Sequence, residues 1–237
     1  MGTGLQQAIA AEFGPLLTVD DHLIRAEELI GEGRIAEAKD LRSRLGDEPR
    51  AYLDAMVASA SGAGDADRKL KAVSAAMRRR SGYKLAEAEV LRRADRIEGA
   101  AAILESVPPG KVVNGDAYWV EARIVARSLA EKGDWRRAYN LASKGFASSN
   151  EDKADEAFHA GWFALIGLKD GARADRHFAV LGAIATTPLT KSRAAYWRGR
   201  ASAAAGRQSA ARQFYEEAAA YGYTYYGQLA RTALGRN

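Results

Sequence analysis

Residues 119–142 read WVEARIVARSLAEKGDWRRAYNLA, and this stretch decides the fold class. Apolar residues before its central glycine recur at the spacing that places them on one helix face: Trp119, Ala122, Ala126 and Leu129. Apolar residues after the glycine do the same: Trp135, Ala138 and Leu141. Gly133 relaxes the φ restriction where the first helix ends, and Asp134 offers an oxygen to the free amides of the second. The stretch therefore predicts two helices joined by a tight turn.

The turn and the alanine that follows it return along the chain, which indicates an internal repeat. Related segments begin at Gly33, Asp95, Asp170 and Gly206. Four alanines stand 36 residues apart: Ala102, Ala138, Ala174 and Ala210. A small residue there lets the partner helix cross closely. We expect an all-α fold, a right-handed superhelix or solenoid of antiparallel helix pairs similar to tetratricopeptide repeats, whose concave face binds partners.

The same periodicity predicts thirteen helices, and no run of alternating apolar residues predicts a strand. The predicted ranges are 20–31, 34–45, 48–61, 66–79, 82–94, 97–106, 115–132, 135–147, 151–168, 171–183, 189–205, 207–220 and 224–234. No linker divides the chain, so we expect one domain over residues 1–237. Within it, residues 1–93 are generic helix pairs and residues 94–237 carry a more specific pattern.

The composition narrows the class of protein. The net charge is +5 and the pI about 9.4, with Lys and Arg spread among Asp and Glu. Arg78, Arg79 and Arg80 form the only dense basic run, which we interpret as a solvated helix end and not a nucleic-acid patch. The absence of cysteine excludes disulfides and thiolate metal sites. The N-terminal residues lack a signal-peptide pattern, and no apolar stretch of about 18 residues predicts a membrane span.

No pattern of catalytic, metal-binding or cofactor-binding residues stands out. The three histidines, His22, His159 and His177, lack a second ligand at metal spacing and are predicted to lie at the edge of the core. The adjacent pairs Glu27-Glu28 and Glu216-Glu217 point about 100° apart on a helix and do not converge on a substrate atom. We therefore predict no catalytic residue, no metal site and no cofactor within the chain.

The aromatic residues allow two interpretations. Tyr118-Trp119, Trp162-Phe163 and Tyr196-Trp197 open the first helices of three repeats, where core packing is favoured and sugar stacking is the alternative. Four tyrosines crowd a short C-terminal stretch: Tyr221, Tyr223, Tyr225 and Tyr226. Such a cluster either caps the array or stays exposed as a docking surface. The candidate binding residues, for docking or glycan contact, are Tyr223, Tyr225, Tyr226, Gln228, Tyr196 and Trp197.

The second half of the chain resembles a known family. Residues 192–201, SRAAYWRGRA, resemble a segment of the soluble lytic murein transglycosylases, and residues 224–230, TYYGQLA, resemble a later segment of the same family. Three upstream segments match its helical region in order: residues 119–126, 133–139 and 160–165. The resemblance is specific from about residue 94 to the end. It identifies these segments with the non-catalytic α-superhelical domain of that family.

The resemblance implies a bacterial, periplasmic protein that acts on peptidoglycan. In that family a lysozyme-like domain follows the YYGQLA segment and cleaves the MurNAc–GlcNAc bond to a 1,6-anhydro product. This chain ends seven residues after that segment, and the family's catalytic Glu-Ser motif is missing. Glu105-Ser106 has the wrong position and neighbours for that motif, so no catalytic role is carried onto it.

The resemblance therefore predicts a helical scaffold that positions glycan strands or the catalytic domain. The expected partners are peptidoglycan, a lysozyme-like domain absent from this chain, and other cell-wall proteins, but not nucleic acid. The alternative is a tetratricopeptide-like adaptor that binds another protein. An enzyme acting through these residues is the weakest hypothesis, because no convergent acid–base pair is visible.

Overall fold

The computed structural model describes residues 14–236, and every regular element in that range is helical, as predicted. The α-helices are α2 (Val19–Gly31), α3 (Ile35–Asp40), α4 (Asp47–Ala60), α5 (Ala66–Ala72), α6 (Ser81–Arg93), α7 (Ile97–Ser106), α8 (Gly115–Glu131), α9 (Trp135–Ala142), α10 (Asn150–Trp162), α11 (Gly171–Ile184), α12 (Pro188–Ala204), α13 (Gln208–Ala219) and α14 (Tyr225–Ala233). The predicted lack of a signal peptide concerns residues 1–13, which lie outside the described residues.

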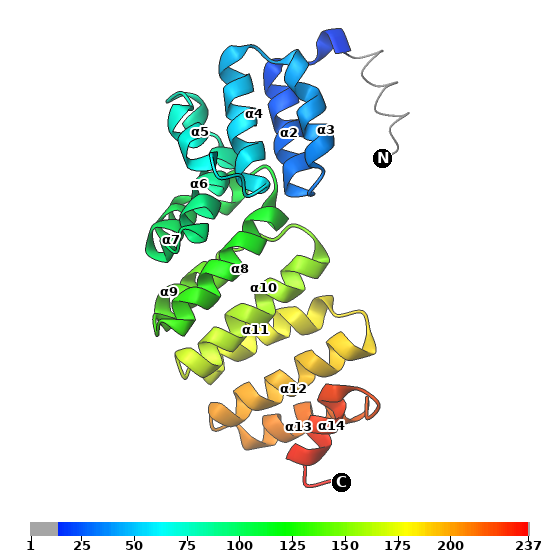
Figure 1. The fold of residues 1–237 in the computed structure, drawn as a ribbon. Helices are drawn as coiled ribbons and strands as arrows, with labels where there is room; N and C mark the ends of the chain where they lie inside the picture. The colour runs from blue at the N-terminus through cyan, green and yellow to red at the C-terminus, as the bar shows by residue number, and fades with distance from the viewer. Residues whose placement is uncertain (1–13, 237) are drawn as a thin grey trace.

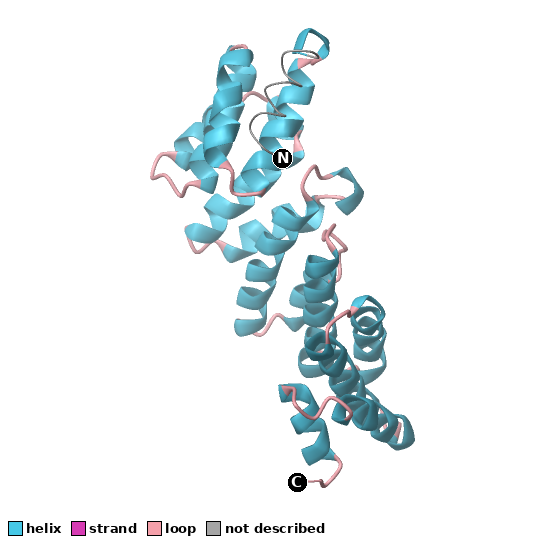
Figure 2. Cartoon of the chain, turned by 90° about the vertical axis from the view of Figure 1, so that its right-hand side faces the viewer, coloured by secondary structure: helices cyan, strands magenta, loops and turns pink. Residues whose placement is uncertain are grey.

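The helices follow one another in space as they do in sequence. Figure 1 shows α2 and α14 at opposite ends of an elongated molecule, and Figure 2 shows the same order from the side. Buried apolar residues form four clusters, spanning α2 to α6, α6 to α10, α10 to α12, and α12 to α14. Because neighbouring clusters share a helix, the hydrophobic core runs along the molecule and has no single centre.

The predicted turn recurs in one hydrogen-bonded form. A residue with positive φ follows α2, α6, α8 and α12: Gly33, Asp95, Gly133 and Gly206. The amide of the next residue donates to the carbonyl five residues earlier, as in the 2.9 Å bond from Asp134 N to Leu129 O. This closure satisfies a carbonyl that the end of the helix would otherwise leave unpaired. The turn can therefore form with Asp95 in place of glycine.

A buried alanine lies five residues after each of these four residues and also after Lys169, which has positive φ too: Ala38, Ala100, Ala138, Ala211 and Ala174. The predicted constant interval of 36 residues is therefore wrong at two of its four positions. Ala102 is exposed, and the buried alanine of the last turn is Ala211, next to Ala210. The turn determines where the partner helix crosses. The number of residues between the turn and the buried alanine is therefore constant, whereas the number of residues between successive buried alanines varies.

Two predicted helices end early because side chains form hydrogen bonds with backbone carbonyls or amides near the end of the helix. Helix α5 ends at Ala72 instead of residue 79, since Arg78 donates to the carbonyls of Val73 at 2.8 Å and Lys71 at 2.6 Å. Helix α9 ends at Ala142 instead of residue 147. The Glu156 carboxylate accepts the amides of Gly145 at 3.0 Å and Phe146 at 2.9 Å, and this holds an irregular segment.

Helix α3 is also shorter than predicted and continues as a 3₁₀-helix over Leu41–Arg44. Helix α10 instead continues into a π-helix, Phe163–Gly167. After this π-helix the amide of Asp170 donates to the Ala164 carbonyl, six residues back instead of five. Gly167 faces Trp135 so closely that an added Cβ would lie 2.3 Å from the ring. The wider turn thus holds one more residue and still leaves Ala174 buried.

Candidate docking surface on the last helix

The last helix is fixed to the array at Thr224, the N-cap residue just before α14 begins. Thr224 caps α14, and its hydroxyl accepts the amide of Gly227 at 3.0 Å. The same hydroxyl donates to Ser192 Oγ on α12 at 2.9 Å, and Ser192 donates to the Leu189 carbonyl at 3.0 Å. Both hydroxyl residues are buried, where an unpaired polar group would be costly. The chain of bonds therefore sets where α14 starts and how its side chains are presented.

The six candidate binding residues divide into two groups. Tyr223, in the turn before α14, is 75% exposed, Tyr225 on α14 is 64% exposed, and Gln228 is exposed on the same helix. Tyr196 is buried and packs against the half-buried Tyr226, with ring centres 5.8 Å apart. Trp197 is half-buried beside Tyr196 at 5.7 Å. The first group presents the more exposed side chains, and in the second the contact of Tyr196 with Tyr226 connects α12 to α14.

Core packing explains most of the other aromatic residues. Tyr118 and Trp119 are fully buried, as the packing interpretation predicted. The Trp119 indole donates to Asp155 at 3.1 Å, which leaves no open edge for a sugar. Phe163 is also fully buried, and the half-buried Trp162 packs on Trp135 at 5.9 Å.

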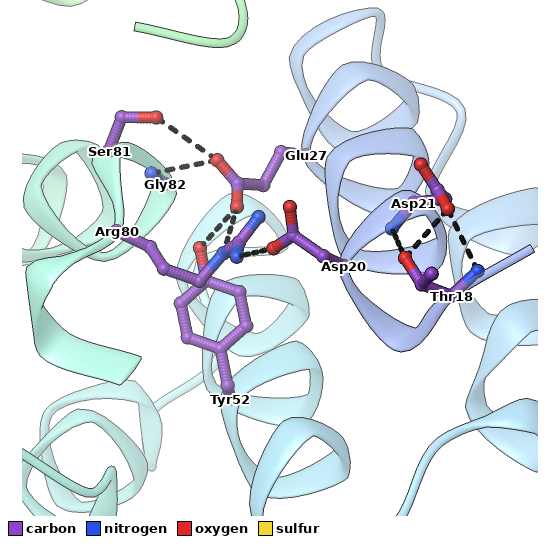
Figure 3. A network of polar contacts seen from close by, with 8 residues as sticks. All are labelled: Thr18, Asp20, Asp21, Glu27, Tyr52, Arg80, Ser81 and Gly82. Carbon is purple, nitrogen blue, oxygen red and sulfur yellow. Dashed lines mark hydrogen bonds and ion pairs between the residues drawn. The ribbon is translucent and has the colours of Figure 1, made fainter. Parts of the chain in front are cut away.

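In the basic run at residues 78–80, Arg78 and Arg79 are exposed at the end of a 3₁₀-helix, Met77–Arg79, as the interpretation of a solvated helix end predicted, whereas Arg80 is half-buried. Arg78 caps backbone carbonyls, and Arg80 donates to the buried carboxylate of Glu27 at 2.7 Å and to Asp20 (Figure 3). Burial lowers the pKa of Arg80, but its hydrogen bonds to Asp20 and Glu27 outweigh that effect and leave the pKa above its usual value. Burial next to Glu27 raises the pKa of Tyr52 well above its usual value. Every partner in this network is used, so the network stabilises the fold and offers no open site.

His159, His177 and Glu105 also have structural partners. His159 Nδ1 lies 2.9 Å from the Asp155 carbonyl oxygen, and His177 Nε2 lies 3.0 Å from the Tyr139 hydroxyl. Burial, helped by Arg176 and Arg173, lowers the pKa of His177. Glu105 forms two bonds with Arg137, at 2.9 and 3.1 Å. The contacts of His177 and Glu105 connect different helices, that of His159 lies within α10, and none of them converges on an open cleft.

A shallow pocket of about 310 Å³ lies between the end of α2 and the start of α8. Glu28, Glu32 and Asp116 line it, but each carboxylate already has a partner: Asn114, Arg34, and the amides of residues 148 and 149 respectively. Among residues 14–236, no group of three His, Asp or Glu side chains is arranged to hold a metal ion. Over the same range, no helix combines the length and apolarity needed to cross a membrane.

The chain matches no family model, no curated protein and no solved structure. Function therefore has to be argued from the residues and their geometry. Sequence reasoning selected Tyr196 and Trp197 but missed the two arginines that flank them, Arg193 and Arg200. The signal was present in the sequence, because no acidic residue occurs between Asp175 and Glu216.

Proposed function

We propose that this chain is a non-catalytic helical scaffold of a peptidoglycan lytic transglycosylase. In this role it positions glycan strands, a lysozyme-like catalytic domain, or both, and another domain carries out catalysis in the bacterial periplasm. The resemblance of residues 192–201 and 224–230 to that family supports the proposal. The consecutive packing of the helices supports the finer fold that we propose, a right-handed tetratricopeptide-like superhelix of antiparallel pairs within a single domain.

One observation of the structure carries the docking role. Tyr223, in the turn before α14, and Tyr225, the first residue of α14, present two large exposed rings on either side of Thr224, which is held by its buried bond to Ser192. Aromatic side chains that are exposed and rigidly held are typical anchors of protein interfaces, because little conformational entropy is lost when they bind. This end of the array is therefore the proposed contact surface for the catalytic domain.

The first test is retention of the chain on purified peptidoglycan sacculi, with the soluble fraction analysed for muropeptides. The scaffold role predicts retention without cleavage. Release of anhydro-muropeptides by this chain alone would overturn the non-catalytic role.

The second test measures binding to a separately purified lysozyme-like transglycosylase domain. Replacing Tyr223 and Tyr225 together with alanine should weaken binding at least about tenfold, as for interface anchors. Leu189→Ala is the matched control, because Leu189 is also an exposed apolar side chain, 53% exposed, but lies on α12. Equal effects of the two changes would contradict docking through α14.

The alternative role is an adaptor that binds an unrelated protein through the same tyrosines. Their exposure at the start of the last helix fits this role equally well. Capture of a protein partner by the wild-type chain, but not by the double tyrosine variant, without retention on sacculi would favour the adaptor over the transglycosylase scaffold.

A further inference from the structure

Positive charge is concentrated in the C-terminal quarter of the chain. Seven basic residues and no acidic residue occur between Asp175 and Glu216. Over residues 176–237 there are nine basic residues and two acidic ones, a net charge of +7, whereas the whole chain carries +5. Residues 1–175 therefore carry −2, and helices α12 to α14 lie in the basic part.

Several of these arginines are neutralised by carboxylates. Arg198 and Arg207 share Asp175 at 2.9 Å, and Arg236 pairs with Glu216 at 2.6 Å. Arg193 and Arg200 form no ion pair with any carboxylate in the described part of the chain. A carboxylate from outside these residues could therefore neutralise them.

The two arginines flank Trp197 on one face of α12. Residues 193, 197 and 200 follow the spacing i, i+4 and i+7, which places them in one stripe along a helix. The guanidinium carbon of Arg193 lies 4.8 Å from the ring centre of Phe158, and that of Arg200 lies 5.5 Å from the ring centre of Trp197. Each guanidinium is thus held against an aromatic ring.

This stripe also contains unmet hydrogen-bond donors. Arg193 Nε and Trp197 Nε1 are buried and have no partner, which makes them two of four such side-chain atoms in residues 14–236. Arg200 Nη1 has only the Tyr196 hydroxyl, at 3.2 Å. Buried donors normally have partners, so two unmet donors one helical turn apart point to an acceptor that binds there.

We propose that the stripe of Arg193, Trp197 and Arg200 is a binding site for a carboxylate-bearing ligand. The planar guanidinium fork matches a carboxylate in shape and charge, and the site supplies donors without a competing acid. The half-buried ring of Trp197 offers apolar surface to the body of the ligand. An acidic sugar and an acidic peptide side chain share this chemistry. The inference rests on the contacts around α12 and does not depend on the proposed function.

The test is a titration followed by NMR of the indole N–H signals. The probes are two matched pairs: N-acetylmuramic acid with neutral N-acetylglucosamine, and the capped peptide Ala-Glu-Ala with Ala-Gln-Ala. We expect a saturable shift of the Trp197 signal with the acidic member of at least one pair and none with the neutral members. Which pair responds identifies the source of the carboxylate. Trp119 is the internal reference, because its indole already donates to Asp155.

Variants distinguish specific binding at this stripe from a general attraction of the acidic ligand to positive charge. Arg193→Gln and Arg200→Gln should each weaken binding about tenfold, since each removes a charge-assisted bond. Arg193→Lys should also weaken it, because the charge remains but the planar fork is lost. Lys191→Gln is the matched control. It removes one charge from an exposed position on the same helix, nearly opposite the stripe by helical angle.

Two outcomes would overturn the site. One is a Trp197 signal that fails to shift with both acidic probes, or shifts equally with their neutral counterparts. The other is a loss of affinity in Lys191→Gln as large as in Arg200→Gln, which would mean a diffuse charge effect. Arg200 is exposed, so its variant keeps the test valid even where Arg193→Gln lowers the thermal midpoint.

Discussion

Replacing Glu27 with alanine should strongly destabilise the N-terminal part of the array. The Glu27 side chain is 3% exposed and accepts four hydrogen bonds: from Arg80 Nε at 2.7 Å, the Tyr52 hydroxyl at 2.9 Å, the Gly82 amide at 3.0 Å and the Ser81 hydroxyl at 3.1 Å. These partners come from α4 and from the start of α6, so one carboxylate on α2 connects three helices (Figure 3).

The magnitude follows from what the substitution leaves behind. Removing one partner of a buried ion pair costs about 3–5 kcal/mol, because the other charge stays buried without compensation. Arg80 keeps Asp20, but Tyr52 and the Gly82 amide lose their acceptor. For a chain of this size each kcal/mol lowers the thermal midpoint by about 2–4 °C, so the expected drop is roughly 6–20 °C.

Urea denaturation and thermal melting followed by circular dichroism would measure this loss. Glu27→Gln should lose less, since one amide oxygen remains as an acceptor, either for Arg80 and Tyr52 or for Ser81 and Gly82. Asp54→Ala is the control, because Asp54 pairs with Arg42 at 2.8 Å while both side chains are more than a third exposed. That change should cost no more than about 1 kcal/mol. If Glu27→Ala costs no more than Asp54→Ala, the buried network does not have the stabilising role assigned to it.

Three further predictions concern the middle and the end of the array. Thr224→Val removes the α14 cap and its buried hydroxyl bond, at a cost of about 1–2 kcal/mol, and hydrogen exchange should accelerate in Tyr225–Ala233 but not in α8. Gly199→Ala should destabilise by about 1–3 kcal/mol, because the new Cβ would lie 2.5 Å from the Tyr215 ring. Gly182→Ala, at an exposed position of α11 where the new Cβ would meet only Ala194 Cβ at an ordinary 3.6 Å, should stabilise by about 0.5–1 kcal/mol, and equal denaturation midpoints for the two glycine variants would contradict the packing argument. The pKa of His177 is lower in the folded chain than in the unfolded chain, so the unfolded chain takes up a proton first as pH falls. The free energy of unfolding is therefore highest above the unfolded pKa of about 6.5 and decreases as pH falls toward the folded pKa. His177→Gln should lose less stability than wild type between pH 7.5 and 5.5, and parallel pH profiles would refute the assignment.

The helices could be predicted because each one repeats a local rule. The range 97–106 was predicted to the residue, and α8 and α12 differ from prediction by a single residue at each changed end. Periodicity fails where a side chain bonds the backbone at the end of a helix. The early end of α9 depends on Glu156 from the following helix, and that of α5 depends on Arg78, which the sequence shows only as part of a basic run.

Burial of the candidate site residues was harder to predict than their location. Tyr225 and Tyr226 are adjacent and identical in type, yet Tyr225 is exposed and Tyr226 packs against Tyr196. The orientation of α14 makes this difference, and it depends on the contact of Thr224 with a serine 32 residues away. No local pattern contains that contact.

The π-helix at Phe163–Gly167 has a consequence for how such an array can change length. Each residue added to a regular α-helix rotates everything after it by about 100°, which would turn a buried face toward water. Here one wider turn accommodates the additional residue before the chain reaches Asp170, and Ala174 is still buried. The helix pairs that follow therefore keep the same faces buried. Insertion or deletion of a single residue in this segment is therefore a local event, and the array can vary in length without misaligning the units that follow.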